Sequence, residues 1–201
     1  MLEKLFAFTR MLSEFREVKI MMKYTTSDVY ENDTEHSYQL AMVCRYILEQ
    51  HPEYDYDLNK VLKYALVHDL IEVYAGDTIP FVSVAIEHNK NPNISLANKH
   101  QREAEALQRL QSEFPEIGEI WAWVEWYEHK IDKESKFVYA IDKLIPELSI
   151  IPDQGKNRQE HRLNMEELLA HKAKALIDPL GTILHGEIVA IIRQHPEWFP
   201  R

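Results

Sequence analysis

Glycine is scarce in this chain, with only five Gly among 201 residues. Because glycine adopts left-handed backbone conformations at little cost, its scarcity leaves few places for the tight hairpins that connect strands. The composition therefore disfavours β-sandwiches and β-barrels and favours helices joined by short loops. The chain also has no glycine-rich loop of the kind that cradles phosphate groups, so a phosphate ligand would need another means of binding.

Positive charge, cysteine and long apolar runs are lacking as well. The formal net charge is −10, which disfavours broad attraction to a nucleic acid polymer or an anionic membrane, so an anionic substrate would need a local cluster or a metal. The single cysteine, Cys44, cannot form an intramolecular disulfide, which fits a reducing compartment. No apolar run approaches the ~20 residues that span a bilayer, and residues 1–6 lack the order of a signal peptide. We therefore expect a cytoplasmic protein with no membrane partner.

Apolar residues recur at spacings of three and four along almost the whole chain, which is the pattern of helices. No segment alternates with a period of two over the length of a strand. The expected helices cover residues 2–18, 34–50, 57–74, 80–88, 95–113, 116–130, 134–150, 160–176 and 183–194. Since no repeat or linker interrupts them, we predict an all-α helical bundle in which residues 1–201 form a single domain. Pro146 should kink or end the helix that contains it.

Three of the predicted helices carry potential metal ligands on the stripe that should be apolar. In the helix over 34–50, His36 continues the spacing set by Leu40 and Val43, which places it on the buried face. In the helix over 57–74, the apolar face runs on into three polar residues, which are His68, Asp69 and Glu72. In the helix over 134–150, the apolar stripe includes Asp142.

A shared metal ion would explain these inward polar residues. A buried carboxylate is costly unless it is paired, hydrogen-bonded or bound to a cation. Taken singly, each residue is more often part of a hydrogen-bonded core than a ligand, but their joint occurrence favours one site. We predict that one divalent metal ion is bound by His36, His68, Asp69 and Asp142. Two imidazoles and two carboxylates suit Mn, Co, Fe, Zn or Mg.

Three segments around these residues resemble the HD-domain phosphohydrolase superfamily, whose motif is a His, a later His-Asp pair and a distant Asp, all on helices. The segments are residues 31–37, 67–77 and 139–144, and they are similar to the small branch that contains bacterial 5′-deoxynucleotidases. The similarity runs from about residue 5 to 150, and the C-terminal helices are expected to pack on this part. The resemblance implies an HD-type helical bundle that hydrolyses a phosphomonoester, most simply a nucleoside 5′-monophosphate, with the help of the metal.

The resemblance also implies roles for residues other than the four ligands. Glu72 and Asp77 would flank the reacting phosphate, one acting on the attacking water and the other protonating the leaving oxygen, with the division between them left open. Both could instead orient His68 or cap a helix. Members of this branch tend to carry an arginine before the first His that holds the phosphate, and Arg16 and Lys19 are the candidates here. The family further suggests a homodimer.

Two other functions remain open. A non-catalytic nucleotide-binding sensor could keep the metal pocket, although it would have no need of proton-transfer groups such as Glu72 and Asp77. A di-iron oxygenase on the same scaffold would need further inward histidines, for which His88 and His100 are candidates. The remaining histidines fall mostly in polar or loop contexts, and most of them are expected at the surface; besides His88 and His100 they are His51, His129, His161, His171, His185 and His195.

Overall fold

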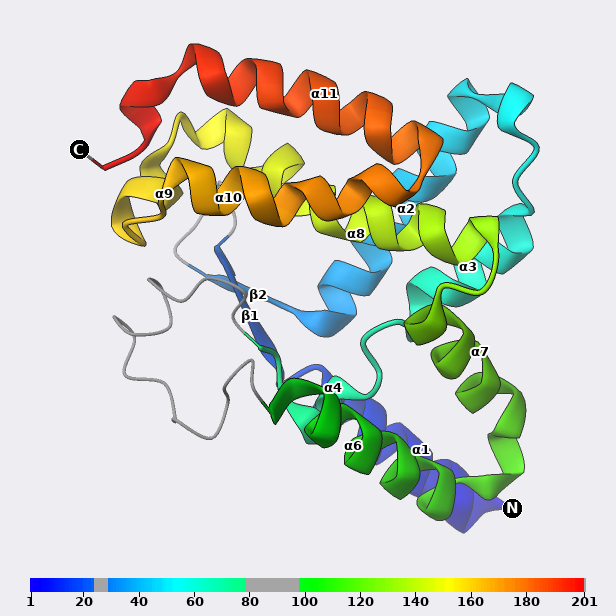
Figure 1. Cartoon of the computed structure of the whole chain (residues 1–201). Helices are drawn as coiled ribbons and strands as arrows, with labels where there is room; N and C mark the ends of the chain where they lie inside the picture. Colours follow the sequence, from blue (N-terminus) through cyan, green and yellow to red (C-terminus); the bar gives the residue numbers. More distant parts are fainter. Residues whose placement is uncertain (24–28, 79–97, 201) are drawn as a thin grey trace.

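The fold is built almost entirely from helices, which confirms the all-α prediction (Figure 1). The computed structural model describes residues 1–23, 29–78 and 98–200. The α-helices among them are α1 (Leu2–Phe15), α2 (Asp33–Gln50), α3 (Leu58–Val67), α4 (Glu72–Ala75), α6 (Lys99–Glu113), α7 (Gly118–His129), α8 (Lys133–Ile150), α9 (Lys156–Glu160), α10 (Met165–Lys172) and α11 (Pro179–Gln194). The short 3₁₀ helices within these ranges are η1 (Pro52–Tyr54), η3 (Pro115–Ile117), η4 (Ile151–Asp153), η5 (Ala173–Ile177) and η6 (Pro196–Trp198). The helix predicted over 80–88 lies outside the described residues.

Helices α2 and α8, which contain the predicted ligands His36 and Asp142, begin within one residue of their predicted starts. Each begins at a polar residue whose side chain accepts a backbone N–H from the first turn. The Asn32 side chain accepts from the Glu35 backbone at 3.1 Å, and Asp132 accepts from the Ser135 backbone at 2.8 Å. These caps satisfy orphan donors at the helix starts and so fix where the helices begin. Helix α8 ends at Ile150, four residues after Pro146, and passes directly into η4.

The prediction of one continuous helix over 57–74 is wrong, because a turn separates α3 from α4. The backbone N–H groups of Leu70 and Glu72 donate to carbonyls three residues earlier, at 3.1 and 2.8 Å, which is tighter than α-helical spacing. The ring of His68 donates its Nδ1–H to the Ala65 carbonyl at 3.0 Å. The His-Asp pair therefore lies in a turn between two helices.

A two-stranded antiparallel sheet between α1 and α2 was not predicted. Strand β1 (Lys19–Lys23) pairs with β2 (Tyr30–Asn32), and the first helix consequently ends at Phe15 and not near residue 18. Strands of five and three residues are too short to show a clear period of two. The sheet leads directly into the first residue of α2, where the site begins.

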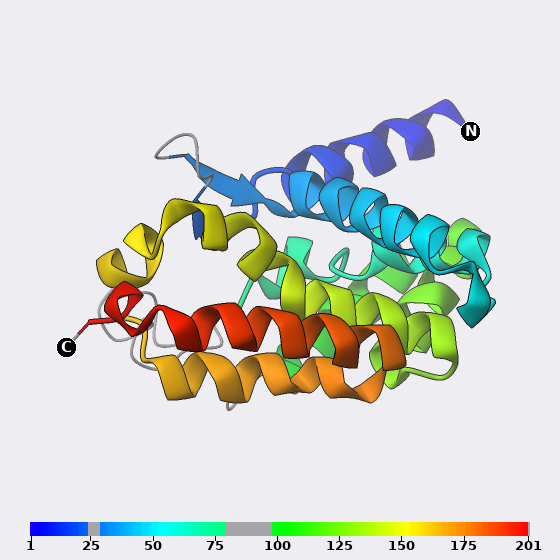
Figure 2. The same cartoon turned by 90° about the horizontal axis from the view of Figure 1, so that it is seen from above.

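Three hydrophobic cores hold the helices together, and α8 contributes to two of them. The first joins α2, α3, α7 and α8, and the second joins α8, α10, η5 and α11. The third joins α1, α4, α6 and α7. Figure 1 shows α1, α4 and α6 gathered at one end of the molecule, with α8, α10 and α11 at the other. Seen from above, α11 runs beside the segment formed by α10 and η5 (Figure 2), and this segment also contacts α8.

The C-terminal helices pack on α8, but the predicted helix over 160–176 is broken into α9, α10 and η5. Arg162 has a left-handed backbone with φ of 47°, and Asn164 then caps α10. Gly181 allows α11 to approach α8, because a Cβ at this position would lie 2.5 Å from the Ala140 Cβ. None of the helices that the structure describes is long and apolar enough to cross a bilayer.

Candidate metal centre

His36 lies in the first turn of α2 and is 4% exposed. Its Nε2 lies 3.1 Å from Oδ1 of Asp142, and its Nδ1 lies 3.9 Å from Oε1 of the buried Glu31. Burial would lower the pKa of His36, but the hydrogen bond and charge of Asp142, with further negative charge from Asp69 and Glu31, raise the pKa to about 9. The ring is thus held in a strongly negative, buried environment.

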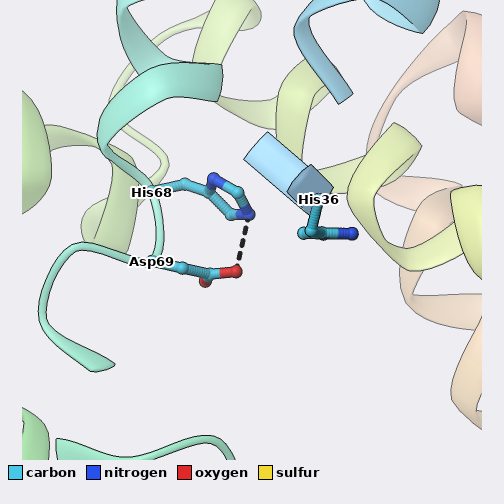
Figure 3. A group of neighbouring side chains, drawn as sticks. All are labelled: His36, His68 and Asp69. Atoms are coloured by element: carbon cyan, nitrogen blue, oxygen red, sulfur yellow. Dashed lines mark ion pairs between the residues drawn. The ribbon is translucent and has the colours of Figure 1, made fainter. Parts of the chain in front are cut away.

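His68 and Asp69 lie in the turn after α3, and their side chains point toward each other (Figure 3). Nε2 of His68 lies 2.8 Å from Oδ2 of Asp69. Because Nδ1 of His68 is hydrogen-bonded to the Ala65 carbonyl, Nε2 is the ring nitrogen that faces the site. The His68 ring also lies 5.4 Å from the ring of His36, measured between centroids.

Asp142 reaches the same place from the middle of α8. Its Oδ1 lies 3.1 Å from Nε2 of His36 and 3.9 Å from Nε2 of His68. Its Oδ2 accepts hydrogen bonds from Lys143 Nζ at 2.5 Å and from the Tyr127 hydroxyl at 3.4 Å. Burial would raise the pKa of Asp142, but Lys143 and the two histidines hold it well below the usual range.

The four predicted ligands therefore come together, and their chemistry fits a divalent ion. Ligand atoms of His36, His68 and Asp69 all lie within 4.8 Å of one another, and Asp142 touches both histidines. Nε2 of His68 is buried and lies 2.8 Å from Oδ2 of Asp69. A cation bound by both atoms would compensate the buried carboxylate. The donor set combines imidazole nitrogen with carboxylate oxygen, as expected from the sequence.

Further carboxylates lie beside these ligands. Oxygens of Asp33, Asp69 and Glu72 form a second group whose members lie within 4.8 Å of one another. Burial, followed by the charges of Asp69 and Asp77, raises the pKa of Asp33 to about 9. Burial, followed by the charges of Asp69, Asp77 and Asp33, raises the pKa of Glu72 well above its usual range. Acidic side chains are therefore crowded together on this side of the centre.

A cavity of about 420 Å³ opens beside the predicted metal ligands. Its walls include both predicted proton-transfer residues, Glu72 and Asp77, as well as the four predicted ligands. The volume lies within the roughly 300 to 1,000 Å³ typical of sites for small molecules. One cavity thus holds the predicted metal ligands together with two carboxylates that could act on a bound molecule.

Five lysines line the cavity, and the sequence analysis assigned a role to none of them: Lys99, Lys130, Lys143, Lys172 and Lys174. Lys143 directly follows Asp142 in the chain and donates to its carboxylate. Lys172 is 3% exposed and donates to the Lys143 backbone carbonyl at 2.8 Å. Burial and neighbouring positive charge lower the pKa of Lys174, and mutual repulsion of this kind makes the wall attractive to an anion. Only Lys143, adjacent to a predicted ligand, had a local signal in the sequence.

The structure does not bring the two predicted phosphate-binding residues to the cavity. Arg16 has a side chain that is 66% exposed and lies 3.6 Å from Glu17. Lys19 is exposed on β1, and neither residue is among the described residues that line the cavity, whereas the adjacent Ile20 is. The basic groups that do line it come from α6 and from the chain after residue 129.

The histidines proposed for a di-iron site add little to the centre. His100 lines the cavity, but its side chain is 99% exposed and it belongs to neither of the two groups of ligand atoms found in the described residues. His88 lies outside the described residues. Two of the histidines expected at the surface line the cavity instead: His161, which is only 6% exposed, and His171, which is half-buried.

Known proteins resemble the chain in sequence and in fold. Proteins named 5′-deoxynucleotidase HDDC2 from Bos taurus and Homo sapiens are each 28% identical to it over 145 residues, which is 69% of this chain. The matches cover 62% and 63% of those proteins, so the chain spans less than two thirds of the curated relatives it matches. The crystal structure of a predicted metal-dependent phosphohydrolase from Magnetospirillum magnetotacticum MS-1 superposes with a TM-score of 0.73 at 23% identity, covering 100% of this chain and 96% of that one. This likeness shows that the fold is shared.

The family model described as HD domain matches residues 16–183, a stretch that contains every ligand of the candidate centre. The resemblance seen in the three sequence segments is thereby confirmed, and the chain belongs to the HD domain family.

Proposed function

We propose that this chain is a metal-dependent phosphohydrolase acting on phosphomonoesters, with nucleoside 5′-monophosphates as its substrates. One observation carries the proposal: a buried histidine and carboxylate centre opens into a cavity that is also lined by five lysines. A metal centre beside a basic wall suits an ester that is anionic at one end. The names of the relatives support a nucleotide, and a 5′-deoxynucleotide in particular.

The proposed metal ligands are His36, His68, Asp69 and Asp142, which hold one divalent ion. A bound ion of this kind supplies neutralisation of phosphate charge and lowers the pKa of a bound water. The chain prepares the ligands by fixing their orientation: the Ala65 carbonyl holds His68, and Tyr127 with Lys143 holds Asp142.

Proton transfer is assigned to Glu72 and Asp77, which lie on the cavity wall beside the ligands. Hydrolysis needs one group that takes a proton from the attacking water and one that gives a proton to the leaving oxygen. Two carboxylates within one cavity can divide these tasks.

Binding of the phosphate is assigned to the lysines, of which Lys143 lies nearest to the ligands. Ammonium groups donate charge-assisted hydrogen bonds to phosphate oxygens. Lys143 is a quarter exposed on its side chain, so its ammonium is accessible from the cavity. This proposal takes the place that the sequence gave to Arg16 and Lys19.

The proposal is tested by a screen of phosphate esters with chelator-treated protein and added Mn²⁺ or Co²⁺. We expect phosphate release from nucleoside 5′-monophosphates, slower release from the 3′ isomers, and none in excess chelator. Asp69→Asn should abolish release, while Asp55→Asn, which changes an exposed aspartate in a left-handed position that asparagine tolerates, should not. A metal-loaded protein that binds nucleotides and releases no phosphate would support the sensor function instead.

Two further proposals concern the surroundings of the protein. We propose a cytoplasmic location, supported by the single buried and unpaired Cys44. We also propose a homodimer, supported by the exposed apolar residues Leu2, Leu5 and Phe6 on α1. Light scattering coupled to size-exclusion chromatography measures the mass, and a monomer at micromolar concentration would contradict the dimer.

A further inference from the structure

The part of the cavity formed by residues 161–174, called here the 161–174 wall, differs in charge from the metal centre. The polar residues that this stretch contributes to the lining are all basic: His161, His171, Lys172 and Lys174. The predicted metal ligands, in contrast, come from α2, the turn after α3, and α8. Basic side chains that line one side of a cavity attract anionic groups, so an anion is the ligand that this wall favours.

Buried positive charge behind the 161–174 wall is only partly compensated within the described residues. Lys172 is 3% exposed and Arg158 is 0% exposed. Both pair with the single carboxylate of Glu147, which lies 3.6 Å from Nζ of Lys172 and accepts a hydrogen bond from Arg158. Nε and Nη1 of Arg158 have no hydrogen-bond partner among the described residues. Because buried charges are costly unless they are compensated, an anion beside Lys172 would stabilise this arrangement.

Lys174 adds a second ammonium group to the wall, and it is accessible to a ligand. Its side chain belongs to an exposed residue of η5 that lines the cavity. Among the described residues, no carboxylate forms an ion pair with it. Burial and the positive charges of Lys143 and Lys99 lower its pKa. A phosphate group bound here would relieve that repulsion and accept charge-assisted hydrogen bonds.

The ammonium groups of Lys143 and Lys172 lie at different places along α8. Nζ of Lys143 donates to the carboxylate of Asp142, a proposed metal ligand, at 2.5 Å. Nζ of Lys172 donates to the Lys143 carbonyl at 2.8 Å and faces Glu147, one helical turn further along. Since a helix rises about 1.5 Å per residue, Glu147 lies about 7.5 Å beyond Asp142 along the helix axis. The cavity therefore offers basic groups at two separate places.

We propose that the 161–174 wall binds a second phosphate group of the substrate through Lys172 and Lys174, while the phosphate to be released lies at the metal centre beside Lys143. The substrate is then a nucleoside 3′,5′-bisphosphate, because the sugar separates its two phosphates. The phosphates of a 5′-diphosphate share an oxygen and would lie together at one place. This inference rests on the proposed function and narrows its substrate class.

The second phosphate takes no part in the chemical step. The oxygen of a water molecule bonds to the 5′ phosphorus, the bond from this phosphorus to the 5′ oxygen breaks, and a proton from the water ends on that oxygen. The products are inorganic phosphate and a nucleoside 3′-monophosphate. The 3′ phosphate contributes the same binding to the ground state and the transition state, so it should lower KM and leave kcat nearly unchanged.

The test compares a deoxynucleoside 3′,5′-bisphosphate with the matching 5′-monophosphate, in steady-state phosphate release by the full-length protein loaded with Mn²⁺. We expect kcat/KM to be about 10-fold or more higher for the bisphosphate, as for the gain of one charged hydrogen bond. Lys174→Met should reduce this preference to near one, and it should fold because Lys174 is exposed. Lys156→Met is the control, because Lys156 is exposed on α9 and is not among the described residues that line the cavity, and it should keep the preference.

A second measurement is independent of catalysis. Calorimetry in excess chelator compares the binding of the bisphosphate, the 5′-monophosphate and the 5′-diphosphate, and the bisphosphate should bind most tightly. A 5′-diphosphate that binds as tightly would show attraction by net charge alone and overturn the separate phosphate site.

The two measurements distinguish failure of this inference from failure of the proposed function. Equal kcat/KM for the bisphosphate and the monophosphate would overturn the second phosphate site and leave the hydrolase intact. Tight binding of the bisphosphate without release of phosphate from any nucleotide would overturn the hydrolase and leave the phosphate site standing. A preference that persists in Lys174→Met would remove Lys174 from the site.

Discussion

Lys143 is expected to weaken the binding of the metal ion and to strengthen the binding of the substrate phosphate. Its ammonium donates to Oδ2 of Asp142 at 2.5 Å, and its side chain is exposed to the cavity. It therefore competes with a metal ion for Asp142 while offering positive charge to a phosphate. Lys143→Met removes the charge and retains most of the apolar length of the side chain.

The size of the effect follows from the loss of one charged hydrogen bond. Such bonds contribute about 1.5 to 3 kcal/mol, which corresponds to a decrease of about 10- to 150-fold in kcat/KM for a nucleoside monophosphate. The affinity for Mn²⁺ should change in the opposite sense, because removing the ammonium frees an oxygen of Asp142 and removes a nearby positive charge. Tighter metal binding together with poorer catalysis is an outcome that general damage to the site cannot produce.

The assay combines a Mn²⁺ titration with steady-state phosphate release at saturating Mn²⁺. Lys136→Met is the matched control, because Lys136 is exposed on the same helix and is not among the described residues that line the cavity. The control should change neither quantity. Weaker Mn²⁺ binding in Lys143→Met, with normal kcat/KM once the metal is saturating, would refute the reasoning and show that Lys143 merely supports Asp142.

Three further predictions concern the metal, the folded state and pH. Asp69→Ala should lose metal and activity together, and wild-type metal content by elemental analysis would remove Asp69 from the coordination sphere. Glu147 is buried and pairs with Arg158. Glu147→Gln leaves buried positive charge uncompensated, so it should lower the free energy of unfolding in urea by about 3 to 5 kcal/mol, which is more than Arg158→Met lowers it. Burial and the charges of Lys172 and Lys174 lower the pKa of His171 from 6.5 to about 3. As the pH falls, the unfolded chain therefore binds this proton before the folded chain does, and the free energy of unfolding decreases below about pH 6.5. His171→Gln should make that decrease smaller when unfolding is measured from pH 7 to 4.5.

Helix periodicity predicted the elements whose ends are determined locally. The starts of α2 and α8 follow from the capping residues Asn32 and Asp132, whose signals lie within three residues of the helix. The turn over 68–71 was missed, because apolar spacing continued across it while the hydrogen bond from His68 to Ala65 favoured a tighter backbone. The two short strands were missed because their pairing joins segments that carry no strand pattern of their own.

The candidate site was predictable to the extent that its residues broke an apolar stripe. His36 and Asp142 each stood among apolar residues at helical spacing, so their inward direction could be inferred, and the structure brings them within 3.1 Å. Asp33 carried no such signal, because an aspartate at the start of a helix is explained equally well by the favourable charge of the helix N-terminus. Its burial depends on the turn after α3 and on Glu72, which lies 39 positions further along the chain.

The lysines that line the cavity are connected to the C-terminal helices by a network of buried ion pairs and hydrogen bonds. Lys172 donates to the Lys143 carbonyl at 2.8 Å and lies 3.6 Å from Glu147, which in turn pairs with the buried Arg158. The Arg158 guanidinium also lies 5.4 Å from the ring of Trp198. Glu147 thus pairs with two basic side chains, one from α9 and one from α10. It lies one helical turn after Lys143 on α8. Changes in this ion-pair network should therefore alter the cavity wall before they alter His36, His68 and Asp69, because α2 packs in the first core and the turn after α3 packs in the third.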